Sequence, residues 1–160
     1  MSDIGLRFRP AVAADLPDLV TMQEPASVAA LSHIFPQDRY PFPRDAVLVR
    51  WTEELRDPAV FVYVSTSDAG AVTGFAARRE DELLHFGTAL DTWGSGLASE
   101  LYGALLATFP AEPPRLRLRV FAENHRARRF WAKHGWQATG AESLSPFPPH
   151  PVLLEYELLR

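Results

Sequence analysis

Three strand-like segments follow one another with no helix between them, and this run constrains the fold more than any other part of the chain. Residues 60–66 and 71–78 flank a turn that ends on Gly70, and residues 82–90 follow a second tight turn at 79–81. Short turns of this kind join antiparallel neighbours in a sheet. The chain is therefore expected to contain a three-stranded antiparallel meander.

Helical and strand patterns surround the meander. Helices are predicted from residue 13 onward, and over 45–56, 95–109 and 124–134; further strands are predicted over 4–9, 115–121, 136–141 and 152–159. Residues 24–45 are expected to be irregular, because they include Pro25, Pro36, Pro41 and Pro43. The order predicts a mixed sheet with helices on both faces, in one domain over residues 1–160.

Composition excludes several classes of function. The chain has no cysteine, which excludes disulfides, thiolate metal sites and cysteine nucleophiles. Its net charge of -4 has the wrong sign for a nucleic-acid binder. No apolar run approaches the ~20 residues that span a bilayer, and the N-terminus lacks the apolar stretch of a signal peptide. We therefore expect a cytoplasmic protein with no metal, nucleic-acid or membrane partner.

The segment after the third strand combines glycines with the start of a helix. Gly94 and Gly96 lie where the first backbone N–H groups of the helix are unpaired and its dipole adds positive charge. A Walker A loop needs a Gly-Lys-Ser/Thr sequence that is missing. A dinucleotide fingerprint needs a third Gly or Ala, but Ser99 stands there, and no acidic residue that could bind a ribose ends the next strand. The loop predicts a diphosphate site, although two glycines alone would also suit a plain turn.

A second segment, residues 124–136, has the pattern of a capped helix. Asn124 is placed as the N-cap, and one helix face carries Ala127, Phe130, Trp131 and His134. Core packing alone would explain such an apolar face. A second face is basic, and solvation alone would explain each of its members, Arg126, Arg129 and Lys133.

Together the two segments resemble motifs A and B of the GNAT superfamily of acyl-CoA N-acyltransferases. Motif A, Gln/Arg-x-x-Gly-x-Gly/Ala, is matched at Gly96 and Ala98, whereas Trp93 replaces the first residue. In motif B the matching residues are Asn124, Ala127, Phe130 and Gly135, whereas Trp131 and Trp136 replace a Tyr and a Phe. The resemblance extends over essentially the whole chain.

The resemblance implies a fold, a reaction and a cofactor. The fold would be α/β (α+β), with a mixed, mostly antiparallel central sheet of about seven strands and helices on both faces. The reaction would move an acetyl group from acetyl-CoA to a small-molecule or peptide amine by direct attack, and a homodimer is a family-level expectation. The residues that would contact acetyl-CoA are Thr88, Ala89, Leu90, Trp93, Gly94, Ser95, Gly96, Leu97, Ala98, Ser99, Asn124, Arg126, Ala127, Phe130, Trp131 and Lys133.

The amine must lose a proton, and the sequence offers two candidate bases. An alkylammonium with a pKa near ~10.4 is almost fully protonated at pH 7, so a base is needed. Glu82 stands where some family members carry a catalytic glutamate, but it could also be the exposed end of a hairpin. His85 would face the other way unless the strand bulges, as it commonly does in the family, and it could also be structural.

The sequence says less about the general acid and about the amine acceptor. Trp131 replaces the family's usual tyrosine acid, and an indole cannot supply a proton at neutral pH. Tyr63, His134 or Tyr156 could take this role. A non-catalytic acyl-CoA-binding or sensing domain is the main alternative, and a purely structural interaction domain is another. Acceptor specificity would come from segments 24–45 and 143–151, which carry His33, Phe35, Tyr40, Phe42, Phe147 and His150.

Overall fold

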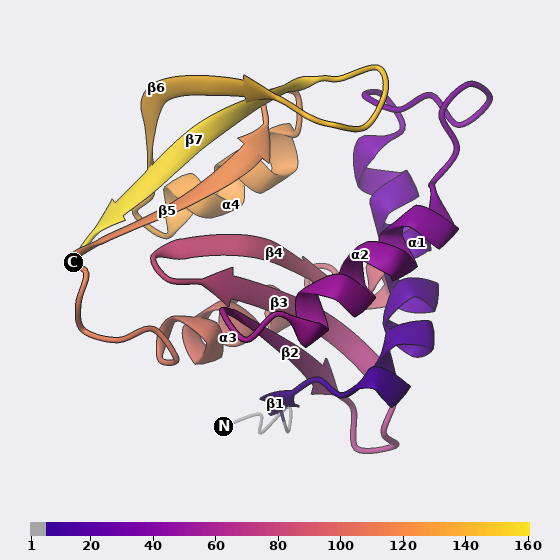
Figure 1. Cartoon of the computed structure of the whole chain (residues 1–160), viewed down its shortest axis with the longest axis horizontal. Coiled ribbons are helices and arrows are strands. Elements are labelled where there is room, and N and C mark those ends of the chain that lie inside the picture. Colours follow the sequence, from indigo (N-terminus) through magenta and orange to yellow (C-terminus); the bar gives the residue numbers. More distant parts are fainter. Residues whose placement is uncertain (1–5) are drawn as a thin grey trace.

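A sheet of seven strands organises residues 6–160, the part of the chain that the computed structural model describes (Figure 1). Its order is β1-β2-β3-β4-β5-β7-β6, and every neighbouring pair is antiparallel except β4 and β5. The mostly antiparallel mixed sheet and the β2–β4 meander are confirmed, while Ile4 and Gly5 of the predicted first strand lie outside the described residues. The strands are β1 (Arg7–Pro10), β2 (Val60–Thr66), β3 (Val72–Arg79), β4 (Glu82–Thr88), β5 (Arg115–Phe121), β6 (Gln137–Leu144) and β7 (Val152–Leu159).

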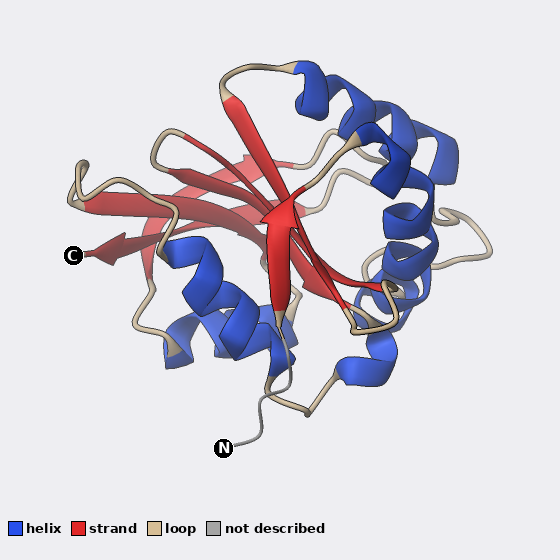
Figure 2. Ribbon diagram, turned by 90° about the horizontal axis from the view of Figure 1, so that it is seen from below, coloured by secondary structure: helices blue, strands red, loops and turns tan. Residues whose placement is uncertain are grey.

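The helices lie in two groups, one on each face of the sheet (Figure 2). Helices α1 (Leu16–Leu31) and α2 (Arg44–Arg56) pack on β2 and β3, and helices α3 (Leu97–Leu106) and α4 (His125–Lys133) pack on the opposite face. Two short 3₁₀ helices, η1 (Ala13–Asp15) and η2 (Leu90–Thr92), precede α1 and α3. None of the helices within residues 6–160 has the length and apolar character that a membrane span requires.

Helix α1 continues through Pro25, and the expectation of irregular chain from residue 24 is therefore wrong as far as Leu31. A proline inside a helix costs about 3 kcal/mol because it removes one backbone hydrogen bond. Leu19 and Val20 are fully buried on one side of the proline and Ala26 is buried beyond it. Burial of this face outweighs the local cost, since tertiary packing supplies most of the stability of a helix in a protein.

Gly103 offers a simple test of the described packing. It lies in the middle of α3 on the exposed side, and a Cβ added there would meet nothing within 4 Å. Gly103→Ala should therefore raise the free energy of unfolding by about 0.5–1 kcal/mol, measured by urea denaturation. Gly74→Ala is the contrasting variant, because its Cβ would lie 2.6 Å from the Ser65 hydroxyl and should destabilise the protein. An unchanged or lower midpoint for Gly103→Ala would contradict this prediction.

Strands β4 and β5 separate soon after they meet, and this separation creates the site. They pair only at Glu82 with Arg117 and at Leu83 with Leu118, and then diverge (Figure 1). The register between β3 and β4 also shifts, so that Leu84 has no partner and forms a bulge. The resemblance led us to expect a bulge in this strand, and the bulge turns His85 toward Glu54 and Trp51 of α2.

Candidate functional site

A pocket of about 390 Å³ occupies the opening between β4 and β5. Its lining extends from α1 and α2 on one side of the sheet to α4 on the other, where it also includes Trp93 and Ala98 on either side of the glycine loop. Beyond Leu83, β4 has no neighbour on this side, and alternate residues of a strand turn their N–H groups to opposite sides. Since the N–H of Ala89 bonds Thr73 of the β3 side, the N–H of Thr88 is directed toward the opening.

The glycine loop at the start of α3 presents free backbone donors. Gly94 and Gly96 adopt φ of 83° and 92°, and a Cβ at either position would meet nothing within 4 Å. The N–H groups of these two glycines, of Ala98 and of Ser99 donate no hydrogen bond within residues 6–160. Four free donors at a helix N-terminus, with no side chain in front of them, fit the diphosphate of a nucleotide cofactor.

Trp93 links the two motifs. Its indole N–H donates to the Thr88 carbonyl over 3.3 Å, and the guanidinium of Arg126 lies 3.6 Å from the centre of its ring. Burial lowers the pKa of Arg126, and the positive charge of Arg129 adds to this effect. The departure from the family pattern at Trp93 therefore has a structural role, since the ring holds a cation from α4 beside the glycine loop.

Asn124 caps α4 as predicted, because its side-chain oxygen accepts the N–H of Ala127 over 3.1 Å. Both residues also line the pocket. The cap therefore fixes the first turn of α4 against the opening between β4 and β5.

Trp131 belongs to the aromatic core between α3, α4 and the sheet. It is 6% exposed and packs edge-on against Phe86, Tyr102 and Trp136 at 5.3–5.7 Å. Phe130 stacks on Phe86 at 5.6 Å, and both Phe130 and Trp131 line the pocket. Phe130 and Trp131 therefore both pack in the core and line the pocket.

The three candidate replacements for the missing tyrosine acid lie outside the pocket lining. The Tyr156 hydroxyl accepts a hydrogen bond from Arg128 over 3.0 Å, and Nε2 of His134 lies 3.3 Å from the Ser99 hydroxyl. Tyr63 is buried against β1. The described geometry therefore gives none of Tyr63, His134 and Tyr156 direct access to a group bound in the pocket.

His85 forms a dyad with Glu54 on the pocket wall. Its Nε2 lies 2.9 Å from both carboxylate oxygens of Glu54 in α2, and its ring packs edge-on against Trp51 at 4.9 Å. An ionised carboxylate accepts only, so a neutral His85 donates through Nε2 and keeps the lone pair on Nδ1. Nδ1 makes no hydrogen bond within the described part of the chain.

The surroundings of His85 favour its neutral form. Burial lowers the pKa of His85, and the positive charges of Arg50 and Arg119 lower it further, against the opposing effect of Glu54. A neutral imidazole with a free Nδ1 and a carboxylate on its other nitrogen can accept a proton and stabilise the resulting charge.

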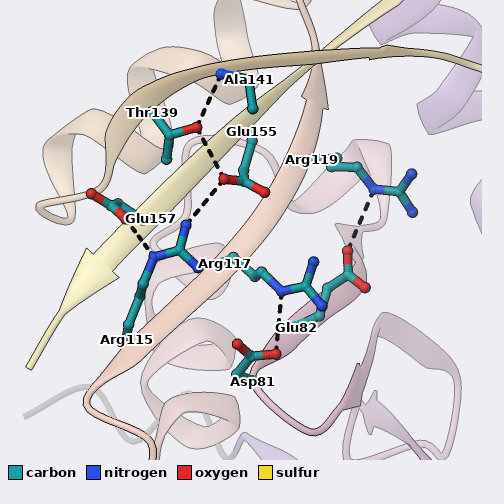
Figure 3. A network of polar contacts seen from close by, with 9 residues as sticks. All are labelled: Asp81, Glu82, Arg115, Arg117, Arg119, Thr139, Ala141, Glu155 and Glu157. Carbon is teal, nitrogen blue, oxygen red and sulfur yellow. Dashed lines mark hydrogen bonds and ion pairs between the residues drawn. The ribbon is translucent and has the colours of Figure 1, made fainter.

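Glu82 lies elsewhere, on the face of β4, β5 and β7 that carries a network of ion pairs (Figure 3). It is 7% exposed, with its carboxylate 3.4 Å from Nε of Arg119. Neighbouring pairs join Arg117 to Asp81 and Arg115 to two glutamates of β7. Glu82 is outside the pocket lining, so the geometry favours His85 over Glu82 as the base.

The pocket brings together about half of the residues singled out from the sequence. Those that line it are His85, Thr88, Trp93, Ala98, Asn124, Arg126, Ala127, Phe130 and Trp131. Gly94, Ser95 and Gly96 form the exposed loop beside it, and the others, Glu82, Ala89, Leu90, Leu97, Ser99 and Lys133, do not line it.

Sequence reasoning missed Arg50 and Glu54 of α2. They are four residues apart and their side chains approach to 3.8 Å. The signal was available, because both lie on the same side of the predicted 45–56 helix as Val47 and Trp51, which are buried. Charged residues on the buried side of a helix are candidates for a functional site.

Comparisons with known proteins agree with this geometry. The comparison with curated proteins gave no significant match. Among solved structures, the apo form of YjaB from Escherichia coli has a TM-score of 0.74 at 19% identity, covering 95% of this chain and 96% of that one. A spermidine N-acetyltransferase from Vibrio cholerae, solved with CoA and spermine, has a TM-score of 0.70 at 16% identity, covering 96% and 95%. An acetyltransferase from Thermus thermophilus has a TM-score of 0.74 at 18% identity, covering 97% of both chains.

At these identities the structural likeness concerns the fold alone, and the sequence family rests on a separate finding. The model of the acetyltransferase (GNAT) domain matches residues 5–137, well over half of the chain. This range includes both the glycine loop and the capped helix α4. The chain belongs to the GNAT acetyltransferase family.

Proposed function

We propose that this protein transfers an acetyl group from acetyl-CoA to the nitrogen of a primary amine by direct attack. The observation that carries the proposal is the His85–Glu54 dyad, which stands on the wall of a pocket whose lining reaches Trp93 and Ala98, on either side of the glycine loop with its free N–H groups. One side of this pocket holds the proposed base, and the other adjoins the proposed nucleotide site.

The donor side is formed by α3 and α4. The N–H groups of the glycine loop would hold the diphosphate, Arg126 would meet a phosphate, and the capped turn of α4 would flank the pantetheine arm. Acetyl-CoA would supply the thioester from which the acetyl group leaves. The N–H of Thr88 would donate to the carbonyl oxygen as negative charge develops on it.

The acceptor side is formed by α1, α2 and β4. His85 would take the amine proton on Nδ1, directly or through one water, as the nitrogen–carbon bond forms and the carbon–sulfur bond breaks. Glu54 would hold the ring in this tautomer and stabilise the imidazolium. The leaving thiolate has a conjugate-acid pKa near ~8.5, so proton transfer from solvent would suffice where Trp131 replaces a tyrosine.

Binding and transfer can be tested separately. Titration calorimetry with acetyl-CoA should show stoichiometric binding, and mass spectrometry with a set of amines should show an acetylated product. Binding without transfer to any amine would support an acyl-CoA sensor in place of an enzyme. An absence of acetyl-CoA binding would overturn the proposal altogether.

A further inference from the structure

The charged side chains that line the pocket are all basic. Arg50 and Arg119 lie on the acceptor side and Arg126 on the donor side, and no aspartate or glutamate is among the described lining residues. Glu54 pairs with Arg50 and Glu82 pairs with Arg119, but neither glutamate lines the pocket. A ligand in the acceptor half would therefore meet cationic groups first.

Among the described residues, Arg50 is the only one of these three cations with a buried nitrogen that lacks a hydrogen-bond partner. Its Nε is buried and has no hydrogen-bond partner, and the guanidinium donates no hydrogen bond within residues 6–160. Its contacts are a carboxylate oxygen of Glu54 at 3.8 Å and the rings of Trp51 and Phe147, whose centres lie 5.8 and 6.0 Å away. Burial lowers the pKa of Arg50, against the effect of Glu54. The two terminal nitrogens of the guanidinium also make no hydrogen bond within these residues, and they are not among the buried atoms. An anionic group in the pocket that accepts from them would therefore be bound favourably.

Arg50 also stands beside the proposed base. Both Arg50 and His85 approach Glu54, at 3.8 and 2.9 Å, from neighbouring elements of the pocket wall. Since Nδ1 and Nε2 belong to the same small ring, an anionic group on Arg50 and an amine at Nδ1 of His85 would lie within the span of one small ligand. An α-amino acid has this arrangement, since its carboxylate and its amine are attached to the same carbon.

Apart from Gln23, Ser27 and Gln37, the rest of the acceptor side is apolar and aromatic. It comes from α1, the segment between α1 and α2, and the β6–β7 loop, with lining residues Ala26, Ala30, Leu31, Phe35, Tyr40, Phe42 and Phe147. A pocket of this composition binds an apolar group and orients it with a few polar contacts.

We propose that the acceptor is an amino acid with an apolar side chain, whose carboxylate is bound by Arg50 while its amine faces His85. The inference rests on the proposed function and narrows it. Arg50 is then a specificity-determining residue. A polyamine would place a second positive charge among Arg50 and Arg119 and would be disfavoured, and a peptide N-terminus would lack the carboxylate.

A binding experiment tests this proposal without requiring turnover. N-acetyl derivatives of leucine, methionine, phenylalanine and tryptophan are titrated by calorimetry, each beside the N-acetyl amine that lacks the carboxylate. At least one carboxylate ligand should bind at least about tenfold more tightly than its neutral counterpart, as charge-assisted hydrogen bonds predict. Equal or tighter binding of all the neutral ligands would overturn the proposal.

Three variants connect the preference to the residue. In Arg50→Met the two affinities should converge, and in Arg50→Lys part of the difference should remain, since a lysine keeps the charge without the planar fork. Arg56→Met is the matched control: Arg56 is exposed on the same helix and does not line the pocket, so the preference should persist. A carboxylate preference that survives in Arg50→Met would overturn the assignment.

Turnover separates this inference from the proposed function. The ratio of kcat/KM for the preferred amino acid to that for its decarboxylated amine should fall at least about tenfold in Arg50→Met. If no amine is acetylated but the carboxylate preference remains, only the proposed function fails. If decarboxylated amines or spermidine are acetylated as well as every amino acid, only this inference fails.

Discussion

Replacing His85 by alanine is expected to lower kcat for amine acetylation by about 10²- to 10⁴-fold, the usual contribution of a general base. The expectation follows from the free Nδ1 of a neutral imidazole on the pocket wall, with Glu54 fixed to its other nitrogen. His85 is on the acceptor side, so the Kd of acetyl-CoA should change by less than about twofold. Steady-state kinetics and calorimetry on the same protein measure both quantities.

The pH dependence provides a second readout of the dyad. The base works when neutral, so kcat should fall as the pH drops through the pKa of His85, which burial places below its usual value near 6.5. Glu54 opposes that shift, and Glu54→Gln should therefore move this limb of the profile to lower pH as well as reduce the maximum rate. The titration of the acceptor amine is the same in both proteins and cannot produce such a movement.

The Glu82→Gln variant tests whether Glu82, rather than His85, is the base. Glu82 is paired with Arg119 outside the pocket lining, and its replacement should lower kcat far less than His85→Ala does. A large loss in Glu82→Gln together with a small one in His85→Ala would assign the base to Glu82. Arg119 both lines the pocket and pairs with Glu82. The Glu82 carboxylate would therefore have to leave this ion pair in order to act on a ligand in the pocket.

The fold was predictable because its signals are local. Turns around Gly70 and at 79–81 define the meander, and the cap at Asn124 defines the start of α4. The extension of α1 through Pro25 was not, because it depends on burial against a sheet that lies elsewhere in the sequence. A proline in the sequence indicates only its local free-energy cost to a helix. The packing that compensates for this cost involves residues distant in the sequence.

The geometry of the glycine loop was predictable for the same reason, and that of the pocket wall beside α2 was not. The free N–H groups of the glycine loop follow from one short segment. The dyad joins residues 31 positions apart, and it requires a bulge at Leu84 to turn His85 toward Glu54. The contact of Arg126 with Trp93 likewise joins two motifs that are separate in the sequence. Contacts of this kind depend on how the strands pair and how the helices pack on them, which the local sequence does not reveal.

Alanine at Gly94 or Gly96 is expected to weaken acetyl-CoA binding by at least about tenfold. Both residues have positive φ, which costs a non-glycine residue roughly 1–2 kcal/mol, and the backbone would relax away from it. That relaxation would turn the free N–H groups away from the diphosphate, where each hydrogen bond to a charged group contributes about 1.5–3 kcal/mol. Calorimetry gives the Kd, and urea denaturation gives the change in unfolding free energy.

Gly70→Ala separates the two effects of such a substitution. Gly70 has φ of 86° and open space around its Cβ position, as Gly94 and Gly96 do, but it lies in the β2–β3 hairpin turn. All three variants should lose about the same unfolding free energy, while only the two loop variants should lose acetyl-CoA affinity. Equal affinity losses in Gly70→Ala and Gly96→Ala would attribute the effect to global destabilisation. An unchanged Kd in both loop variants would remove the glycine loop from the donor site, and the N–H groups of α3 would need another role.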